Sequence, residues 1–146
     1  MNKGKKYILF LLIALISSEC KHGPCDELVN GVYPYPILPE NHNMTHEEVN
    51  KYYDLPVDIC SCITTWGLVE TCLNYPQLGL ISLSGHDLQT GYNGFLRPIF
   101  RGVRELETRP DRGTYLLKKL KSIDPLGYDP NWNPVEIGHY GMNIFF

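Results

Sequence analysis

The chain has 146 residues, the size of one domain, and its 43% hydrophobic and 20% charged residues are typical of a globular protein. Beyond residue 19 it carries 10 basic and 15 acidic residues, a net charge of −5. That balance argues against general affinity for nucleic acid, which requires an excess of Lys and Arg.

Residues 1–19 have the pattern of a signal peptide. Lys3, Lys5 and Lys6 precede an apolar run of ten residues, YILFLLIALI. A helix that spans a bilayer needs about 20 apolar residues, so this run is too short to be a membrane anchor. It has the length of the apolar core of a signal peptide, and we therefore expect export.

Cys20 follows this apolar run directly after Ser17, Ser18 and Glu19. Its position resembles that of the lipid-attachment cysteine of bacterial lipoproteins, which receives a diacylglycerol after cleavage just before it. Glu19 departs from the pattern, because a small residue usually stands there. The resemblance implies that a lipid on Cys20 makes the membrane a partner. The alternative is cleavage after Ser18, which would release a soluble secreted protein.

Residues 20–44 are predicted to form an extended tether. Pro34, Pro36 and Pro39 alternate with apolar residues, which favours a polyproline-like conformation and gives no helical period. We interpret the segment as a spacer that holds a domain away from a membrane. A ligand for a proline-binding groove is the alternative, and apolar residues such as Tyr33 and Tyr35 leave packing against the following helices open.

Residues 45–123 are predicted to form the helical domain. Thr45 and Glu48 make a capping box at the start of its first helix. In the next stretch, residues 52–76, we expect two helices, one capped by Asp54 and one by Thr64. Pro76 ends the second of these helices. The apolar run of residues 77–83 is interpreted as a connector, because helices are expected on both sides of it.

The second half of this domain continues with short helices. Ser84 or Asp87 begins one helix, Pro98 separates it from the next, and Asp111 caps the last. Residues 124–146 are expected to form an irregular tail. The fold class is therefore all-α, a compact array of five or six short helices whose proline-marked corners are similar to those of an α-solenoid. The expected core residues are Trp66, Leu68, Val69, Leu73, Leu88, Phe95, Phe100, Val103, Leu106, Leu116 and Leu120.

Three sequence stretches together resemble an uncharacterised group of exported α-helical domains of bacterial lipoproteins. They are Met44-Thr45-His46-Glu47-Glu48-Val49 with Leu55-Pro56, then Gly67-Leu68-Val69-Glu70-Thr71-Cys72-Leu73-Asn74-Tyr75-Pro76, and Arg109-Pro110-Asp111. The resemblance covers residues 44–123. It implies export and a helical fold, and it implies no catalytic residue.

If Cys20 is lipidated, four cysteines remain, an even number that permits disulfides in an exported chain. Cys60 and Cys62 would point about 200° apart on a helix and are poor partners for one another. A disulfide between Cys25 and either Cys60 or Cys62 is one interpretation. The favoured interpretation is that the thiols are free and buried, with Cys72 on the inward face of its helix.

Catalytic and metal sites have weaker signals. Cys60 or Cys62 with His86 and Asp87 would supply the residue types of a thiol hydrolase or redox enzyme, but no spacing brings them together. His42 and His46 are four residues apart, yet His42 precedes the helix cap, so we interpret both as solvated. We predict no catalytic residue, metal or cofactor.

A basic patch is the last candidate site. Arg97, Arg101 and Arg104 would share one face of a helix, whereas the charged residues between 26 and 87 are nine acidic and one basic. This face could bind an anionic partner: a polysaccharide, lipid headgroups or an acidic protein. The favoured alternative is that the basic half pairs with the acidic half or is simply solvated.

These patterns predict an exported, lipid-anchored, non-enzymatic helical domain that binds or scaffolds at the cell envelope, without nucleic acid as a partner. The first alternative is the thiol enzyme described above. The second is a truncated accessory region of a larger secreted enzyme, which the abrupt apolar end at Ile144, Phe145 and Phe146 keeps open.

Overall fold

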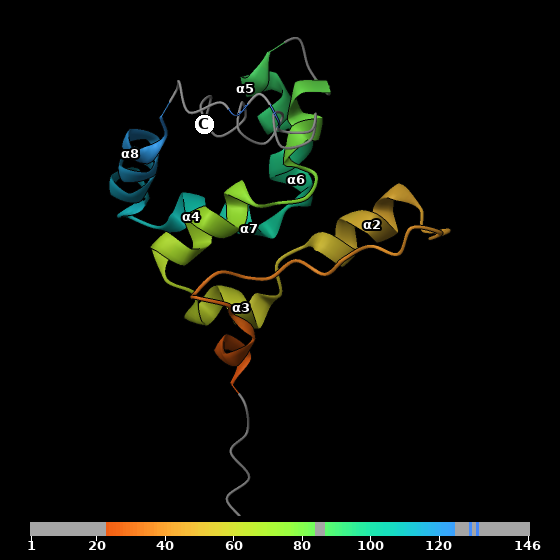
Figure 1. Ribbon diagram of the computed structural model, residues 1–146, viewed down its shortest axis with the longest axis horizontal. Helices are drawn as coiled ribbons and strands as arrows, with labels where there is room; N and C mark the ends of the chain where they lie inside the picture. Colours follow the sequence, from red (N-terminus) through yellow and green to blue (C-terminus); the bar gives the residue numbers. More distant parts are fainter. Residues whose placement is uncertain (1–22, 84–86, 125–128, 130, 132–146) are drawn as a thin grey trace, which may run out of the picture.

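The computed structural model describes residues 23–83, 87–124, 129 and 131 (Figure 1). These residues are mostly helical and contain no β-strand, only an isolated bridge between Val29 and Val32. The predicted all-α fold is confirmed. The elements are η1 (Pro24–Glu27), α2 (His46–Tyr53), α3 (Val57–Cys62), α4 (Thr65–Leu73), η2 (Leu78–Leu83), α5 (Leu88–Gly91), η3 (Tyr92–Leu96), α6 (Arg97–Ile99), α7 (Arg101–Thr108) and α8 (Arg112–Ser122).

Three of the predicted helix starts have the expected caps. The Glu48 amide donates to Thr45 Oγ1 at 3.3 Å, and the Thr45 amide donates to Glu48 Oε2 at 2.7 Å. Thr64 Oγ1 accepts from the Gly67 amide at 3.1 Å. Asp87 Oδ1 accepts from the Thr90 amide at 2.8 Å. Short polar side chains before an apolar run therefore located these helices correctly.

The predicted cap at Asp54 is wrong. Asp54 ends α2, and α3 begins after Pro56, which occupies the N-cap position without a side-chain bond. The Asp54 carboxylate instead accepts from the Arg101 amide at 2.6 Å and forms an ion pair with the Arg101 guanidinium at 3.2 Å. Because this partner lies on α7, far along the chain, local sequence could not reveal it.

The expected break at Pro98 lies two residues later. Helices α5, η3 and α6 follow one another without a loop, and the extended backbone of Phe100 then separates them from α7. Pro98 cannot donate a backbone hydrogen bond to the preceding turn. The π-helical turn η3 lies directly before α6, and π-bulges and prolines are both recognised causes of a bend in a helix.

The core centres on the rings of Tyr75 and Phe100, which are fully buried and stack with centroids 4.1 Å apart and planes 14° apart. The helices close around a single hydrophobic cluster, and α4 contacts both α7 and α8. The array is therefore closed around a core and not stacked linearly as in a solenoid. Of the expected core residues, those buried are Leu68, Val69, Leu73, Phe100, Val103 and Leu106, and those partly buried are Leu88, Phe95 and Leu116.

Two expected core residues are exposed. Trp66 is 41% exposed and Leu120 is 45% exposed. Trp66 shares a face of α4 with Glu70, four residues later, and that face is turned toward α8 and not into the core. Leu120 belongs to α8, in which no residue is buried. The hydrophobic pattern predicted both helices correctly, but it did not show which face of each helix is covered by the rest of the protein.

Residues 28–44 form an extended segment, here named the N-terminal strap, which packs along the helices (Figure 1). Tyr33, Tyr35 and Leu38 lie partly buried against the core. The ring of Tyr35 lies 5.8 Å from that of Tyr75 and 6.4 Å from that of Phe100, measured between centroids. The expectation of an extended conformation is correct, but these residues are not a free spacer, because their aromatic rings complete the core.

The strap is also hydrogen-bonded to α4 and α2. The Tyr33 amide donates to Thr71 Oγ1 at 3.1 Å, and the Tyr35 hydroxyl donates to the Thr71 carbonyl at 3.1 Å. The Tyr52 hydroxyl donates to the Ile37 carbonyl at 3.2 Å. Thr71 is fully buried. Its hydroxyl is satisfied by the strap, as a buried polar group requires.

A tight hairpin begins the strap. Val29 and Val32 exchange two backbone hydrogen bonds of 2.9 and 3.0 Å around Asn30 and Gly31, whose φ angles are 53° and 80°. Positive φ at both central residues is the geometry of a type I′ turn, for which Asn-Gly is the preferred pair. The Gly31 carbonyl lies against Gly67 of α4, where a Cβ atom would overlap it. The backbone of the hairpin therefore lies directly against the backbone of α4.

Candidate functional site

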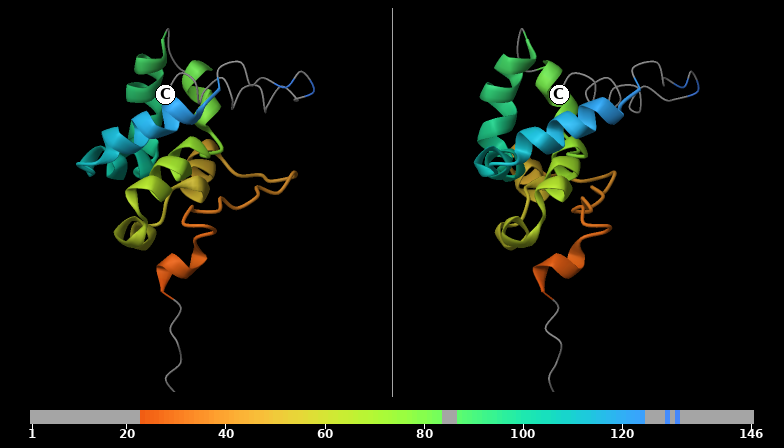
Figure 2. Two further views of the ribbon diagram at one scale, coloured as in Figure 1. Left: turned by 60° about the vertical axis from the view of Figure 1, so that its left-hand side comes forward. Right: turned by 90° about the vertical axis from the view of Figure 1, so that its left-hand side faces the viewer.

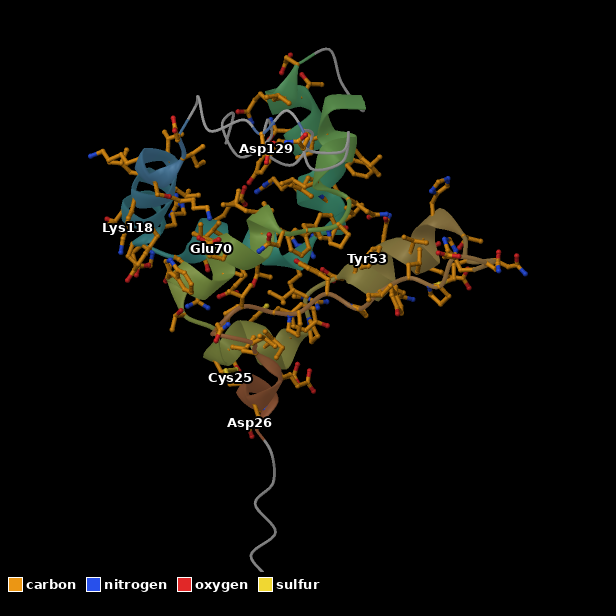
Figure 3. All side chains as sticks on the ribbon, viewed as in Figure 1. Cys25, Asp26, Tyr53, Glu70, Lys118 and Asp129 are labelled. Atoms are coloured by element: carbon orange, nitrogen blue, oxygen red, sulfur yellow. A yellow bond between two sulfur atoms is a disulfide. The ribbon has the colours of Figure 1, made fainter. Side chains whose placement is uncertain are left out.

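The candidate site is the end of the molecule at which η1, just before the strap, is covalently joined to α3. Cys25, within η1, forms a disulfide with Cys62, the last residue of α3, with 5.9 Å between their Cα atoms (Figure 3). Both further views place η1 beside α3 (Figure 2). Of the two partners considered for Cys25, the structure places Cys62 there, and Cys60 points into the core. The favoured interpretation of four free thiols is not what the structure shows.

Cys60 and Cys72 are free thiols, and both are buried. Burial raises the pKa of each thiol, because the charged thiolate loses hydration in the core. A thiol attacks as its thiolate, so these two cysteines have the properties of small core residues and not of nucleophiles. His86, the candidate base of the thiol-enzyme alternative, lies outside the described residues, and Asp87 is occupied as the cap of α5.

Two arginines, Arg101 of α7 and Arg109 directly after it, connect α3 to α7. Arg109 donates to the carbonyl of Cys60 at 2.8 Å and forms an ion pair with Glu105 at 2.8 Å. The Arg101 guanidinium donates to the Leu55 carbonyl in addition to pairing with Asp54. Together these contacts hold both ends of α3 against α7. A cation at the carboxyl end of a helix also complements its dipole.

The predicted basic patch is engaged within the protein. Arg97 pairs with Glu107 at 2.9 Å, and Arg101 pairs with Asp54. Arg104 donates to the carbonyls of Arg97 and Pro98 at 2.9 and 2.8 Å. The three arginines do not share one helix, because Arg97 lies on α6 and the other two on α7. Only Arg101 pairs with the acidic half, as the alternative expected, whereas Arg97 and Arg104 have partners in their own half.

No group of three metal-ligating side chains gathers among the described residues. His42 uses Nδ1 to accept a hydrogen bond from the Met44 amide at 3.3 Å, which is a local turn contact. His46 is the first residue of α2. The two imidazoles considered at the sequence level thus belong to a loop and a helix start.

Residues of α4 line two hollows. One is an apolar cavity of about 120 Å³, lined by core residues that include Val69, Tyr92 and Leu116. The other is a surface groove of about 250 Å³ between α4 and α8, here named the α4–α8 groove. Its lining residues are Trp66, Glu70, Tyr115, Lys118, Lys119 and Ser122. Sequence reasoning missed this groove, although the spacing of Trp66 and Glu70 already placed them on one helical face.

Within the described part of the chain, no helix has the length and apolar character to cross a membrane. Comparison with known proteins finds no family model, curated protein or solved structure that matches this chain. The resemblance to exported domains of bacterial lipoproteins therefore stays a prediction, and function must be argued from the residues themselves.

Proposed function

We propose that the chain is an exported, lipid-anchored, non-enzymatic helical domain that binds or scaffolds at the cell envelope. The observation that carries the proposal is the disulfide between Cys25 and Cys62. Disulfides persist in oxidising compartments outside the cytosol and are rare within it. The disulfide therefore agrees with the signal-peptide pattern of residues 1–19.

The position of the disulfide limits how far a lipid on Cys20 would hold the helical domain from the bilayer. Cys20 precedes Cys25 by five residues, and five residues span at most about 17 Å when fully extended. Because Cys25 is bonded to α3, a lipid on Cys20 would hold the helical domain close to the bilayer with its α3 end nearest. The strap beyond Cys25 adds no reach, since it packs on the helices.

The chemistry of the thiols supports a binding role over the thiol-enzyme alternative. Cys62 is committed to the disulfide, and Cys60 is buried with a raised pKa. A thiol enzyme needs an accessible cysteine whose pKa is lowered by a neighbouring cation or helix terminus. Neither cysteine of the Cys-x-Cys pair meets that requirement in this structure.

The test is the intact mass of the mature protein from its native host, after alkylation under denaturing conditions without a reductant. We expect a chain that begins at Cys20 and carries a diacylglycerol adduct, with two alkylated thiols from Cys60 and Cys72. Cys20→Ser is the control and should lose the adduct. A bare chain would contradict the anchor, and four alkylated cysteines in the lipidated chain would contradict the disulfide.

A further inference from the structure

The α4–α8 groove is lined by aromatic, charged and hydroxyl-bearing side chains. Trp66 and Glu70 enter it from α4, and Tyr115, Lys118, Lys119 and Ser122 enter it from α8. On α8 these residues recur at the three- and four-residue spacing of one helical face. Figure 3 shows Glu70 on α4 and Lys118 on the neighbouring α8.

Two aromatic rings line the groove, one exposed and one packed against the edge of the core. Trp66 is 41% exposed, and Tyr115 is partly buried at the edge of the core. Large aromatic side chains that remain at a concave surface beside polar groups are typical of binding sites. Such rings offer flat apolar faces to the C–H faces of a ligand.

The polar groups of the groove are held in place. Lys119 Nζ donates to Glu70 Oε2 at 2.7 Å, and this ion pair bridges the two helices. Ser122 donates its hydroxyl proton to the Lys119 carbonyl at 2.6 Å, which leaves its oxygen able to accept. Lys118 is exposed and has no carboxylate partner among the described residues. The groove thus offers one unpaired cation, fixed acceptors and aromatic faces.

We propose that the α4–α8 groove binds an acidic saccharide. A sugar ring would stack on Trp66 and Tyr115, its carboxylate would pair with Lys118, and its hydroxyls would donate to Glu70 and Ser122. This inference rests on the proposed function, because it supplies a ligand for a binding domain at the cell envelope.

The size and charges of the groove favour a saccharide over an acidic peptide. Its volume of about 250 Å³ is below the roughly 300–1,000 Å³ of drug-sized pockets, so it fits one sugar ring better than a length of polypeptide. The carboxylate of Glu70, already paired with Lys119, can accept from the hydroxyls that a saccharide carries around its ring, whereas the side chains of an acidic peptide have no hydroxyl to donate. A free phosphate ion would make no use of the aromatic faces.

The test is calorimetric titration of the purified mature protein with trigalacturonic acid, with neutral maltotriose and with a short poly-glutamate peptide. We expect trigalacturonic acid to bind most tightly. Trp66→Ala should weaken it about tenfold or more, the range in which stacking on aromatic side chains contributes. Lys118→Gln should weaken it severalfold and reduce its dependence on salt. Lys121→Gln, the same charge change on α8 outside the groove, should leave binding unchanged.

Several outcomes would overturn the inference. These are equal binding of maltotriose, tighter binding of poly-glutamate, an equal effect of Lys121→Gln, and no binding of any probe. Trp66 and Lys118 are exposed, so both variants should fold, and thermal unfolding checks this. The mass measurement is independent of ligand, so a groove that binds nothing on a lipidated protein would refute the groove alone.

Discussion

The N-terminal strap and helix α8 both lie on α4, yet they are held there in different ways. The strap has almost no regular secondary structure, but its tyrosines reach the core and its backbone is bonded to Thr71. Helix α8 is the longest described helix, with 11 residues, but none of them is buried. Regular hydrogen bonding and contribution to the core are thus separate properties. We expect the irregular segment to contribute more to the stability of the domain than the regular helix does.

The largest effect should come from removing the disulfide that fixes the strap. Cys62→Ser should lower the free energy of unfolding by about 4 kcal/mol, the chain-entropy value for a sequence separation of 37 residues. Urea denaturation measures the change. Cys25→Ser should have an equal effect, and the double variant should be no worse than either. A loss below about 1 kcal/mol would mean that packing alone holds the strap.

Tyr35→Ala should come next, at about 3 kcal/mol, the lower end for deleting an aromatic ring from a core, because this ring is only partly buried. Tyr35→Phe is the matched control. It keeps the ring and deletes the hydroxyl that donates to the Thr71 carbonyl, so it should lose about 1 kcal/mol. If the two variants were equally stable in denaturant titrations, the hydrogen bond and not the ring would hold the strap.

High pH should weaken α4, the helix that both regions share. Burial raises the pKa of the Cys72 thiol above its ordinary value of 9.0, so the folded state keeps a proton that the unfolded state releases. This contribution to stability is therefore complete below pH 9 and is lost as pH rises above it, by on the order of 1 kcal/mol at pH 10. Denaturation at pH 8 and pH 10 should show a smaller difference for Cys72→Ala than for the native chain. An unchanged difference would argue that Cys72 is not the group responsible.

The smallest effects should belong to α8. Leu116→Ala should lower stability by about 1 kcal/mol, less than a fully buried leucine would, because its side chain is only partly covered. Leu120→Ala should change it by less than about 0.5 kcal/mol, since that side chain is 45% exposed. Thermal unfolding of the two variants side by side tests the comparison. A loss at Leu120 as large as that at Tyr35 would show that α8 is covered in solution by something further.

The features that sequence predicted correctly are those that depend on neighbours in the chain. Thr45, Thr64 and Asp87 cap helices through bonds to residues three positions later. The features that it missed depend on distant partners. Asp54 contacts Arg101, and Thr71 is buried by the strap, neither of which periodicity can reveal.

The hairpin and the groove illustrate two further limits of the sequence reading. The hairpin had a local signal in Asn30-Gly31, which the proline-rich surroundings obscured. For the groove, the hydrophobic pattern of α4 predicted that Trp66 lies in the core, but Trp66 is exposed. Hydrophobic periodicity shows which face of a helix is apolar, but it does not show which other segment covers that face. For the groove the missing information was the position of α8, whereas the hairpin could have been predicted from its own residues.

The close contact between the hairpin and α4 restricts two positions of the sequence to glycine. A side chain at position 67 would push the Gly31 carbonyl away, and position 31 itself requires the left-handed backbone that glycine adopts most readily. Substitutions elsewhere in the core can be offset by neighbouring changes in volume, but no neighbour can make room for a Cβ atom between two backbones. Descendants of a common ancestor should therefore retain this pair of glycines after most other identities have been lost, and the pair offers a way to recognise them.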